Sequence, residues 1–357
     1  MDELLYIVND FAVQHFSDQL FNTEEGKSVA LSYFKKRGLR EDTIRAFGLG
    51  YAPDQRDLLL QRARNAGHSV ELLKKTGLCS QEGNRDFFRA RVMFSIHSLS
   101  GKVAAFAGRT MSSDKTIPKY VNSPETEIYV KNKLLYGAFQ AKKAIRQQDE
   151  CILVEGYMDV ISLHQAGIEN VVASSGTTLT EGQLLIIKRN TKNLKILYDG
   201  DEAGIDAALK TIDIALPLGI YPRFAIIPFG LDPDSYIHKY GYESLIKIIC
   251  NSKSFVEIIY NDQIEKTIGF PDKKSNLAKK IVGKISLIDD PEYRSIYSNE
   301  LCNLFGFPIQ IINNEIEKQR HNITTWQNKK QKRVKYLSKC HAKRQALKPR
   351  TSQESSA

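Results

Sequence analysis

From residue 151 to residue 228, short apolar runs alternate with segments of helical pattern. Runs of roughly 4–8 apolar residues are typical of buried strands. Here they cover residues 151–154, 170–174, 194–198 and 223–228. The helical patterns between them cover residues 159–166, 180–189 and 202–216. Repeated strand–helix–strand units place their strands parallel and side by side. The alternation therefore predicts an α/β domain built around an open parallel sheet.

Acidic residues follow three of these strands. They are Glu155 and Asp159, Asp199 and Asp201, and Asp232 and Asp234. Because the carboxyl ends of parallel strands share one edge, where open α/β sheets bind ligands, we expect all six to lie together. Carboxylates so close repel one another unless cations neutralise them. Hard divalent cations held by oxygen ligands, Mg²⁺ or Mn²⁺, meet that requirement.

Each acidic cluster also has an ordinary structural explanation. Glu155 is a solvated strand end in that interpretation, and Asp159 or Asp201 caps the helix that follows it. Asp199-Gly-Asp and Asp232-Pro-Asp are turn signatures as well. We favour the metal site because three acidic turns coincide at one end of one predicted sheet.

The rest of the chain predicts helices on both sides of this domain and a hairpin before it. The expected N-terminal helices cover residues 4–21 and 27–37. A hairpin of strands 91–96 and 102–106 precedes a turn-rich loop, 118–124, and a helix, 137–146. The expected C-terminal helices cover residues 235–250, 255–267, 273–286 and 291–305.

Composition and charge indicate the cellular location that we expect for the protein. The net charge of +10 lies mostly in residues 328–357, which hold ten Lys or Arg and one Glu, so the rest of the chain is near neutral. No apolar run approaches the roughly 18–20 residues that span a bilayer, and no signal-type core follows Met1. Five cysteines without a C-x-x-C pair predict reduced thiols and no zinc site in this chain. We therefore expect a cytoplasmic protein without a membrane partner.

Three segments around the acids resemble the motifs of a TOPRIM domain. They are Leu153–Asp159, Tyr198–Gly204 and Leu231–Asp234. Four segments upstream are similar to the catalytic core of bacterial replicative primases of the DnaG type. They are Arg89–Ile96, Ala107–Arg109, Lys119–Thr126 and Leu135–Gly137. Together the matched motifs cover about residues 80–300.

The resemblance implies a mixed α/β architecture in four parts. A mixed α+β N-terminal subdomain with a basic groove covers residues 1–148, and a TOPRIM domain with a Rossmann-like parallel sheet covers 149–234. A helical subdomain, 235–325, and a basic disordered tail, 326–357, complete the chain.

The resemblance also implies a DNA-directed RNA polymerase that makes short RNA primers on single-stranded DNA from ribonucleoside triphosphates. Glu155 is then the candidate general base or metal-shell acid, and Asp199 and Asp201 are the principal catalytic metal ligands. Asp159, Asp232 and Asp234 complete or support the site. The cofactor would be Mg²⁺ or Mn²⁺.

A basic and polar set matches the positions with which this family contacts nucleotide and template. The set consists of Arg37, Arg109, Lys119, Tyr120, Asn122, Ser123 and Lys131. Some members have simpler explanations. In these explanations, Arg37 before Gly38 is a favourable charge at a helix C-terminus. Lys131 is only an exposed lysine, and Tyr120 packs against the protein instead of stacking on a base.

Two flanking domains of this family are not visible in the sequence. One binds zinc at the N-terminus, and the other docks on the replicative helicase, so both initiation and helicase recruitment are in doubt. Another TOPRIM enzyme, a nuclease or topoisomerase, is the enzymatic alternative. A non-catalytic protein that binds single-stranded DNA or a replisome partner is the other alternative.

Overall fold

The computed structural model describes residues 2–175, 179–199, 202–322 and 325. The basic tail predicted for residues 326–357 lies outside this range. The chain forms two compact units, one up to Ile258 and one from Ile259 onward. Both sheets belong to the first unit.

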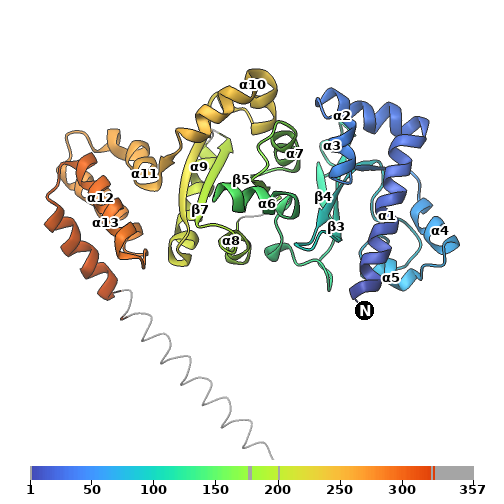
Figure 1. Ribbon diagram of the computed structural model, residues 1–357, viewed down its shortest axis with the longest axis horizontal. Helices are drawn as coiled ribbons and strands as arrows, with labels where there is room; N and C mark the ends of the chain where they lie inside the picture. The colour runs from blue at the N-terminus through green and yellow to red at the C-terminus, as the bar shows by residue number, and fades with distance from the viewer. Residues whose placement is uncertain (1, 176–178, 200–201, 323–324, 326–357) are drawn as a thin grey trace, which may run out of the picture. The chain divides into compact units, whose positions relative to one another are not determined.

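The first sheet is antiparallel, with four strands in the order β1-β2-β3-β4 (Figure 1). The strands are β1 (Gly50–Ala52), β2 (Arg91–His97), β3 (Val103–Thr110) and β4 (Tyr120–Asn122). The predicted hairpin is confirmed as β2 and β3, where Arg91 pairs with Thr110. The segment predicted as a loop, 118–124, contains strand β4 instead. Three residues are too few to show an alternating pattern, and their pairing with β3 defines the strand.

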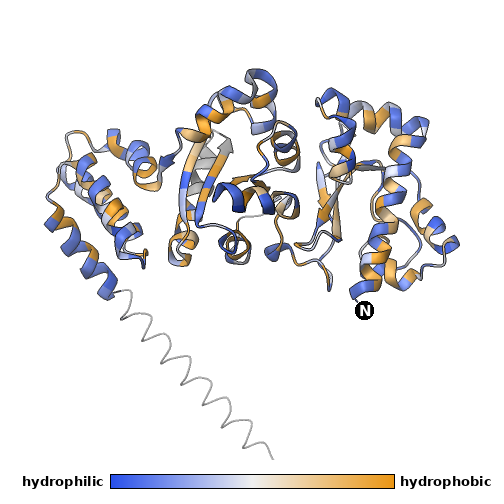
Figure 2. Ribbon diagram, in the orientation of Figure 1, coloured by the Kyte–Doolittle hydropathy of each residue, from blue (hydrophilic) through white to orange (hydrophobic). Residues whose placement is uncertain are grey.

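Helices cover the first sheet. They are α1 (Asp2–Asn22), a π-helical stretch (Gly26–Leu31), α2 (Ser32–Lys36), α3 (Glu41–Ala46), α4 (Leu58–Asn65) and α5 (Val70–Lys75). The helices predicted at 4–21 and 27–37 are thereby confirmed. In Figure 2, α1 alternates apolar and polar stretches. Its apolar side, with Leu5, Val8 and Ala12 fully buried, packs toward β1 and β3.

The second sheet has five strands in the order β6-β5-β7-β8-β9. The strands are β5 (Cys151–Val154), β6 (Val171–Ala173), β7 (Asn193–Asp199), β8 (Tyr221–Ile227) and β9 (Lys253–Ser254). Strands β5 to β8 are parallel, as predicted. At one edge a further strand that was not predicted, β9, pairs antiparallel with β8. A two-residue strand carries no apolar pattern of its own, so it could not be predicted from the sequence.

Five helices belong to this second sheet. They are α6 (Ala138–Gln148), α7 (Tyr157–Gln165), α8 (Glu181–Lys188), α9 (Glu202–Ala215) and α10 (Pro233–Cys250). Helix α7 packs against α10, and α10 packs against β7 and β8 (Figure 1). Helix α7 begins two residues before the predicted residue 159, because Gly156 has extended backbone and forms its N-cap.

The second unit is helical over most of its described residues. Helix α11 (Phe255–Gln263) leads into it, and α12 (Pro271–Ile285) and α13 (Pro291–Phe305) pack against each other. Across the described part of the chain, no helix combines the length and the apolar character needed to cross a bilayer.

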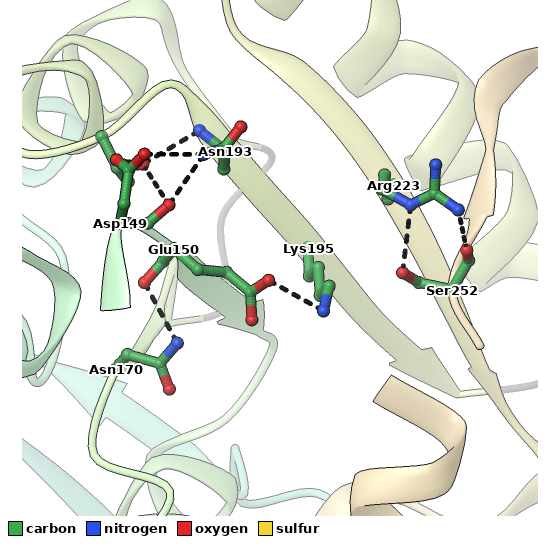
Figure 3. A network of polar contacts seen from close by, with 8 residues as sticks. Asp149, Glu150, Asn170, Asn193, Lys195, Arg223 and Ser252 are labelled. Atoms are coloured by element: carbon green, nitrogen blue, oxygen red, sulfur yellow. Dashed lines mark hydrogen bonds and ion pairs between the residues drawn. The ribbon is translucent and has the colours of Figure 1, made fainter. Parts of the chain in front are cut away.

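A network of neutralised polar groups lies where the strands of the second sheet begin, here called the amino edge (Figure 3). The carboxylate of Asp149 accepts hydrogen bonds from Thr191 Oγ1 at 2.8 Å and from Asn193 Nδ2 at 3.1 Å. Glu150 pairs with Lys195 at 2.8 Å, and its carbonyl accepts from Asn170 Nδ2 at 3.0 Å. These bonds fix the starts of β5, β6 and β7 relative to one another.

Candidate functional site

The predicted acids that the structure describes lie at the opposite, carboxyl edge of the second sheet. Glu155 follows β5 directly, Asp199 is the last residue of β7, and Asp232 lies beyond β8 as the N-cap of α10. Strands β5, β7 and β8 are neighbours in that order. Glu155 is exposed to solvent. Asp201 and the side chain of Asp199 lie outside the described part of the structure.

Asp159 is a buried carboxylate in the first turn of α7, with a side chain aimed back at the strand end. Its Oδ2 accepts from the Gly156 N–H at 2.9 Å, and its Oδ1 accepts from the Asp234 N–H at 3.2 Å. Burial and, after it, the negative charge of Asp232 raise the pKa of Asp159 to about 7. Asp159 therefore connects two acidic loops and ionises near neutral pH.

Asp234 is fully buried and surrounded by partners. Its Oδ2 pairs with Arg37 Nη1, and its Oδ1 accepts from the Ser162 hydroxyl and lies 3.3 Å from His238 Nε2. Burial raises the pKa of Asp234, whereas Ser162 and Arg37 oppose that shift. A buried carboxylate costs several kcal/mol unless it is paired and hydrogen-bonded, and these partners supply both conditions.

The donor set at this edge consists of carboxylate oxygens, the ligands that hard divalent cations prefer. Within the described residues, no three Asp, Glu, His or Cys side chains converge closely enough to hold a metal ion. The two acids of the Asp199-Gly-Asp201 motif fall outside that description. Burial and the charge of Asp232 raise the pKa of Asp159, and a bound cation would relieve the repulsion between these two carboxylates. The residues present thus fit a divalent cation by chemistry and by charge.

Arg37 brings positive charge from the N-terminal helices to this edge. It is the C-cap of α2, and its backbone leads into Gly38 at φ +70°. The positive φ favours glycine, and a Cβ on Gly38 would lie 2.6 Å from His238 Cε1, so a larger residue would also displace the imidazole. Gln165 of α7 donates to the Gly38 carbonyl at 2.8 Å and holds the same turn. The nearby charges of Asp234 and Asp232 raise the pKa of Arg37 despite its partial burial.

Arg109 is a second arginine of the predicted set and lies on β3. Its guanidinium lies 4.6 Å from the centre of the Tyr33 ring. Its Nε is buried without a hydrogen-bond partner among the described residues. A buried donor without a partner is costly, and an anionic ligand oxygen would satisfy it.

An aromatic cluster joins the two sheets next to the acids. Tyr157 of α7 stacks on Phe94 of β2 with ring centres 5.3 Å apart, and it meets Tyr136 edge-on at 4.7 Å. The ring centre of Tyr120 of β4 lies 5.7 Å from that of Tyr157. The Tyr157 hydroxyl donates to Asn122 Oδ1 at 2.9 Å. The loop that carries Glu155 is thereby fixed against the strand that carries Tyr120 and Asn122.

Asn122 and Lys131 line one small hollow at the end of β6. The hollow measures about 20 Å³, and Ser174 and Ser175 form part of its wall. Tyr136 Oη and Ser175 Oγ are buried here without a hydrogen-bond partner among the described residues. A space of about 10–15 Å³ already holds one water molecule. The hollow thus offers polar groups to a water molecule or a ligand atom.

Two further members of the predicted basic set lie on or beside β4. Lys119 is exposed, and its carbonyl accepts from the Thr110 N–H at 2.9 Å. Ser123 is fully buried, and its hydroxyl accepts from the Phe106 N–H at 3.1 Å. Lys119 is therefore open to a ligand, whereas Ser123 secures the sheet in this structure.

Several residues at the site were not predicted from the sequence. Ser162 and His238 support Asp234, Gln165 holds the Gly38 turn, and Tyr33 and Tyr157 supply rings. Two of these follow acids at helical spacing, since Ser162 is three residues after Asp159 and His238 is four after Asp234. That spacing places them on the same helix face, which is a signal the sequence did contain.

Two protein-family models match the chain. Residues 15–142 match the family described as "DNA primase catalytic core, N-terminal domain". Residues 152–237 match the family described as "Toprim-like". The first match covers the first sheet with most of its helices, and the second covers the parallel strands β5 to β8.

Curated relatives are named DNA primase. The one from Halalkalibacterium halodurans is 36% identical over 320 residues, which are 88% of this chain and 53% of the relative. The one from Clostridium acetobutylicum is 38% identical over 329 residues, again 53% of the relative. The chain thus spans about half the length of the curated relatives it matches.

Solved structures give the same result. A structure of the DnaG catalytic core is 33% identical, with 86% of this chain and 99% of that chain covered and a TM-score of 0.76. The Aquifex aeolicus primase structure with zinc-binding and RNA polymerase domains is 32% identical, with 87% and 74% covered and a TM-score of 0.76. A DnaG primase catalytic domain bound to single-stranded DNA is 33% identical, with 85% and 98% covered and a TM-score of 0.75.

Proposed function

Because the chain belongs to the family of DnaG-type bacterial DNA primases, whose catalytic core it matches, we propose that it is a primase core. It synthesises short RNA primers on single-stranded DNA by divalent-metal-dependent nucleotidyl transfer. The observation that carries this proposal is the carboxyl edge of the second sheet. There, buried Asp159 and Asp234 meet Asp232 and the cationic Arg37, next to the strands of a primase-type N-terminal sheet.

The acids have distinct tasks in this proposal. TOPRIM primases generally use a divalent metal, which neutralises phosphate charge and lowers the pKa of the attacking hydroxyl when it is bound. In this proposal Glu155, which is exposed at the end of β5, takes the proton of the primer 3′-hydroxyl. Asp199, Asp201 and Asp232 would hold Mg²⁺ or Mn²⁺. Asp159 and Asp234 keep the acidic loops in register, through the hydrogen bond between Asp159 Oδ1 and the Asp234 N–H.

The cationic and polar groups serve the nucleotide and the template. Arg109 has a buried Nε without a protein partner among the described residues, and its planar guanidinium suits a phosphate oxygen. Lys119 offers a mobile charge, and Lys131 with Asn122 lines the hollow at the end of β6. Tyr120 and Ser123 support these groups from β4. Ribonucleoside triphosphates would enter between the two sets.

The remaining assignments follow the family. Single-stranded DNA is the template and an RNA primer is the product. A replicative helicase is the expected partner of the longer relatives. We propose that the protein acts in the cytoplasm. We also keep the division into 1–148, 149–234 and 235–325 as functional parts, the first with the basic groove and the second with the acids.

One assay tests the proposal. The purified chain is incubated with a single-stranded template, labelled ribonucleotides and Mg²⁺ or Mn²⁺, with and without a primase zinc-binding domain added in trans. We expect short template-dependent RNA, weak without the added domain and lost in Asp199→Asn. Unchanged synthesis in that variant would remove the metal site from the proposal. No product under any condition would favour a protein that only binds single-stranded DNA.

A second pair of variants tests the nucleotide side. Lys131→Ala should raise the KM for ribonucleotides several-fold, because Lys131 lines the hollow with Asn122. Lys133→Ala is the matched control, since Lys133 is an exposed lysine on the same short turn but outside that lining. Equal effects of the two changes would contradict the assignment of Lys131.

A further inference from the structure

A second hollow lies away from the acids, beside the edge strand β6. It lies between helices α6 and α8 and measures about 160 Å³. Its floor is apolar, since Leu135, Val172 and Ile187 line it and each is only about 1% exposed. A cavity of about 150 Å³ with such a lining accommodates one benzene-sized group. The hollow therefore has room for one large apolar side chain.

Three cations surround this hollow. Lys142 and Arg146 come from α6, and Arg189 comes from the C-terminal end of α8. Among the described residues, no carboxylate forms an ion pair with any of them. Arg146 Nε donates to Asn190 Oδ1 at 2.8 Å, a neutral partner that orients the guanidinium without cancelling its charge. The rim is thus positive and uncompensated around an apolar floor.

An apolar hollow with a cationic rim matches one kind of ligand. Buried apolar anchors supply most of the affinity of small interfaces, and complementary charges at the rim supply specificity and orientation. We propose that this hollow binds an acidic peptide segment of a partner protein. One leucine- or phenylalanine-sized side chain enters the hollow, and flanking aspartates or glutamates face Lys142, Arg146 and Arg189.

Nucleic acid fits this place less well. Proteins bind single strands with aromatic platforms on which bases stack, along a continuous basic groove. None of the side chains that line the hollow is aromatic. A phosphate would also leave the apolar floor without a function. The proposal is independent of primer synthesis, because none of these residues belongs to the catalytic site described above.

A fluorescent peptide with one central phenylalanine between two runs of aspartates is a direct probe, read by anisotropy. We expect saturable binding that weakens at least about tenfold when the phenylalanine is replaced by alanine. The double variant Lys142→Glu with Arg189→Glu should weaken binding by at least about tenfold as well, since two attractive pairs become repulsive.

A matched control is available on the same two helices. Lys143→Glu with Lys188→Glu makes the same change in net charge, but these exposed lysines do not line the hollow. We expect peptide binding within about twofold of the unaltered protein in this control. Primer synthesis and the circular dichroism spectrum should be unchanged in both double variants, which shows that the fold is intact.

Three outcomes would overturn the proposal. One is the absence of peptide binding, and another is equal binding by the two double variants. The third is a loss of oligothymidylate binding in the Lys142/Arg189 variant alone, with the peptide unbound, which would assign the cations to nucleic acid. Ala138→Leu, which fills the hollow without changing charge, should also weaken the peptide, and unchanged binding there would contradict insertion of the anchor.

Discussion

The two edges of the second sheet both carry carboxylates, but the negative charge is neutralised differently at each edge. At the amino edge, Asp149 accepts from Thr191 and Asn193, and Glu150 pairs with Lys195 (Figure 3). At the carboxyl edge, Asp159 is buried beside Asp232, and its pKa rises to about 7. The acids of the amino edge are balanced by side chains, whereas Asp159 is held by backbone N–H groups and lies near the like charge of Asp232. This difference supports the carboxyl edge as the candidate site.

The largest contrast should appear in catalysis. Asp159→Asn replaces an acceptor of two backbone N–H groups with an amide, so the loops that carry Glu155 and Asp234 lose their common anchor. We expect primer synthesis to fall about 10- to 100-fold. Asp149→Asn, the same change at the amino edge, should stay within about twofold of the unaltered protein. Equal losses in the template-dependent assay would mean that the two edges do not differ in function.

The pH dependence of stability is the next contrast. The folded pKa of Asp159, about 7, exceeds its unfolded value of 3.8, so the folded state binds more protons between those values. The free energy of unfolding should therefore fall as pH rises from 5 to 7, by about 2 kcal/mol from this group. Urea unfolding should show that Asp159→Asn removes this part of the slope. Burial of Asp86, whose pKa is raised to about 6, contributes equally to both proteins.

Divalent cations provide a check on the same slope. At pH 8, Mg²⁺ should stabilise the unaltered protein more than Asp159→Asn, because a cation relieves the repulsion between ionised acids. An equal rise in Tm for the two proteins would separate Asp159 from the cation site.

A third prediction concerns the amino edge alone. Asp149 has positive φ, 47°, and its carboxylate accepts two side-chain hydrogen bonds. Asp149→Ala should cost about 1.5 kcal/mol of unfolding free energy, from the lost bonds and the strained backbone. Asp149→Gly should recover part of that loss, because glycine tolerates the backbone. If alanine and glycine were equally destabilising, the strain would contribute nothing.

The smallest effect is expected for the ion pair at the same edge. Glu150 and Lys195 are 2.8 Å apart with side chains 26% and 17% exposed. Glu150→Gln should cost about 0.5 kcal/mol in thermal or urea unfolding, and the loss should shrink in high salt. Primer synthesis should not change. A loss of synthesis would show that the amino edge influences the acids at the other end of the strands.

The sequence predicted the second sheet well because strands such as β5 and β6 are buried on both faces. Such strands appear as continuous apolar runs, and β5 lies at the predicted residues. The short strands β1, β4 and β9 escaped prediction, since two or three residues show no alternation and only their pairing with other strands defines them. Helix α7 begins at Tyr157 and not at the predicted residue 159, because the N-cap is Gly156, which lacks the capping side chain that usually indicates a helix start.

The candidate site was predictable in composition but not in contacts. Acids at strand ends follow from the pattern of the chain, and Arg37 does occupy the helix C-terminus that its sequence context suggested. Its pairing with Asp234 could not be inferred, because it requires α2 and α10 to meet in space. Likewise, only the folded chain shows Ser123 buried under β3 while Lys119 faces solvent.

The two members of the ion pair between Arg37 and Asp234 are synthesised at different times. Its members are separated by 197 positions in the chain. A ribosome that adds ~5–20 residues per second therefore needs roughly 10–40 s between one and the other. During that interval the N-terminal helices and the first sheet have emerged, while the counter-charge of Arg37 has yet to be made. The buried carboxylate of Asp234 and its cationic partner Arg37 can therefore meet only after α10 has emerged.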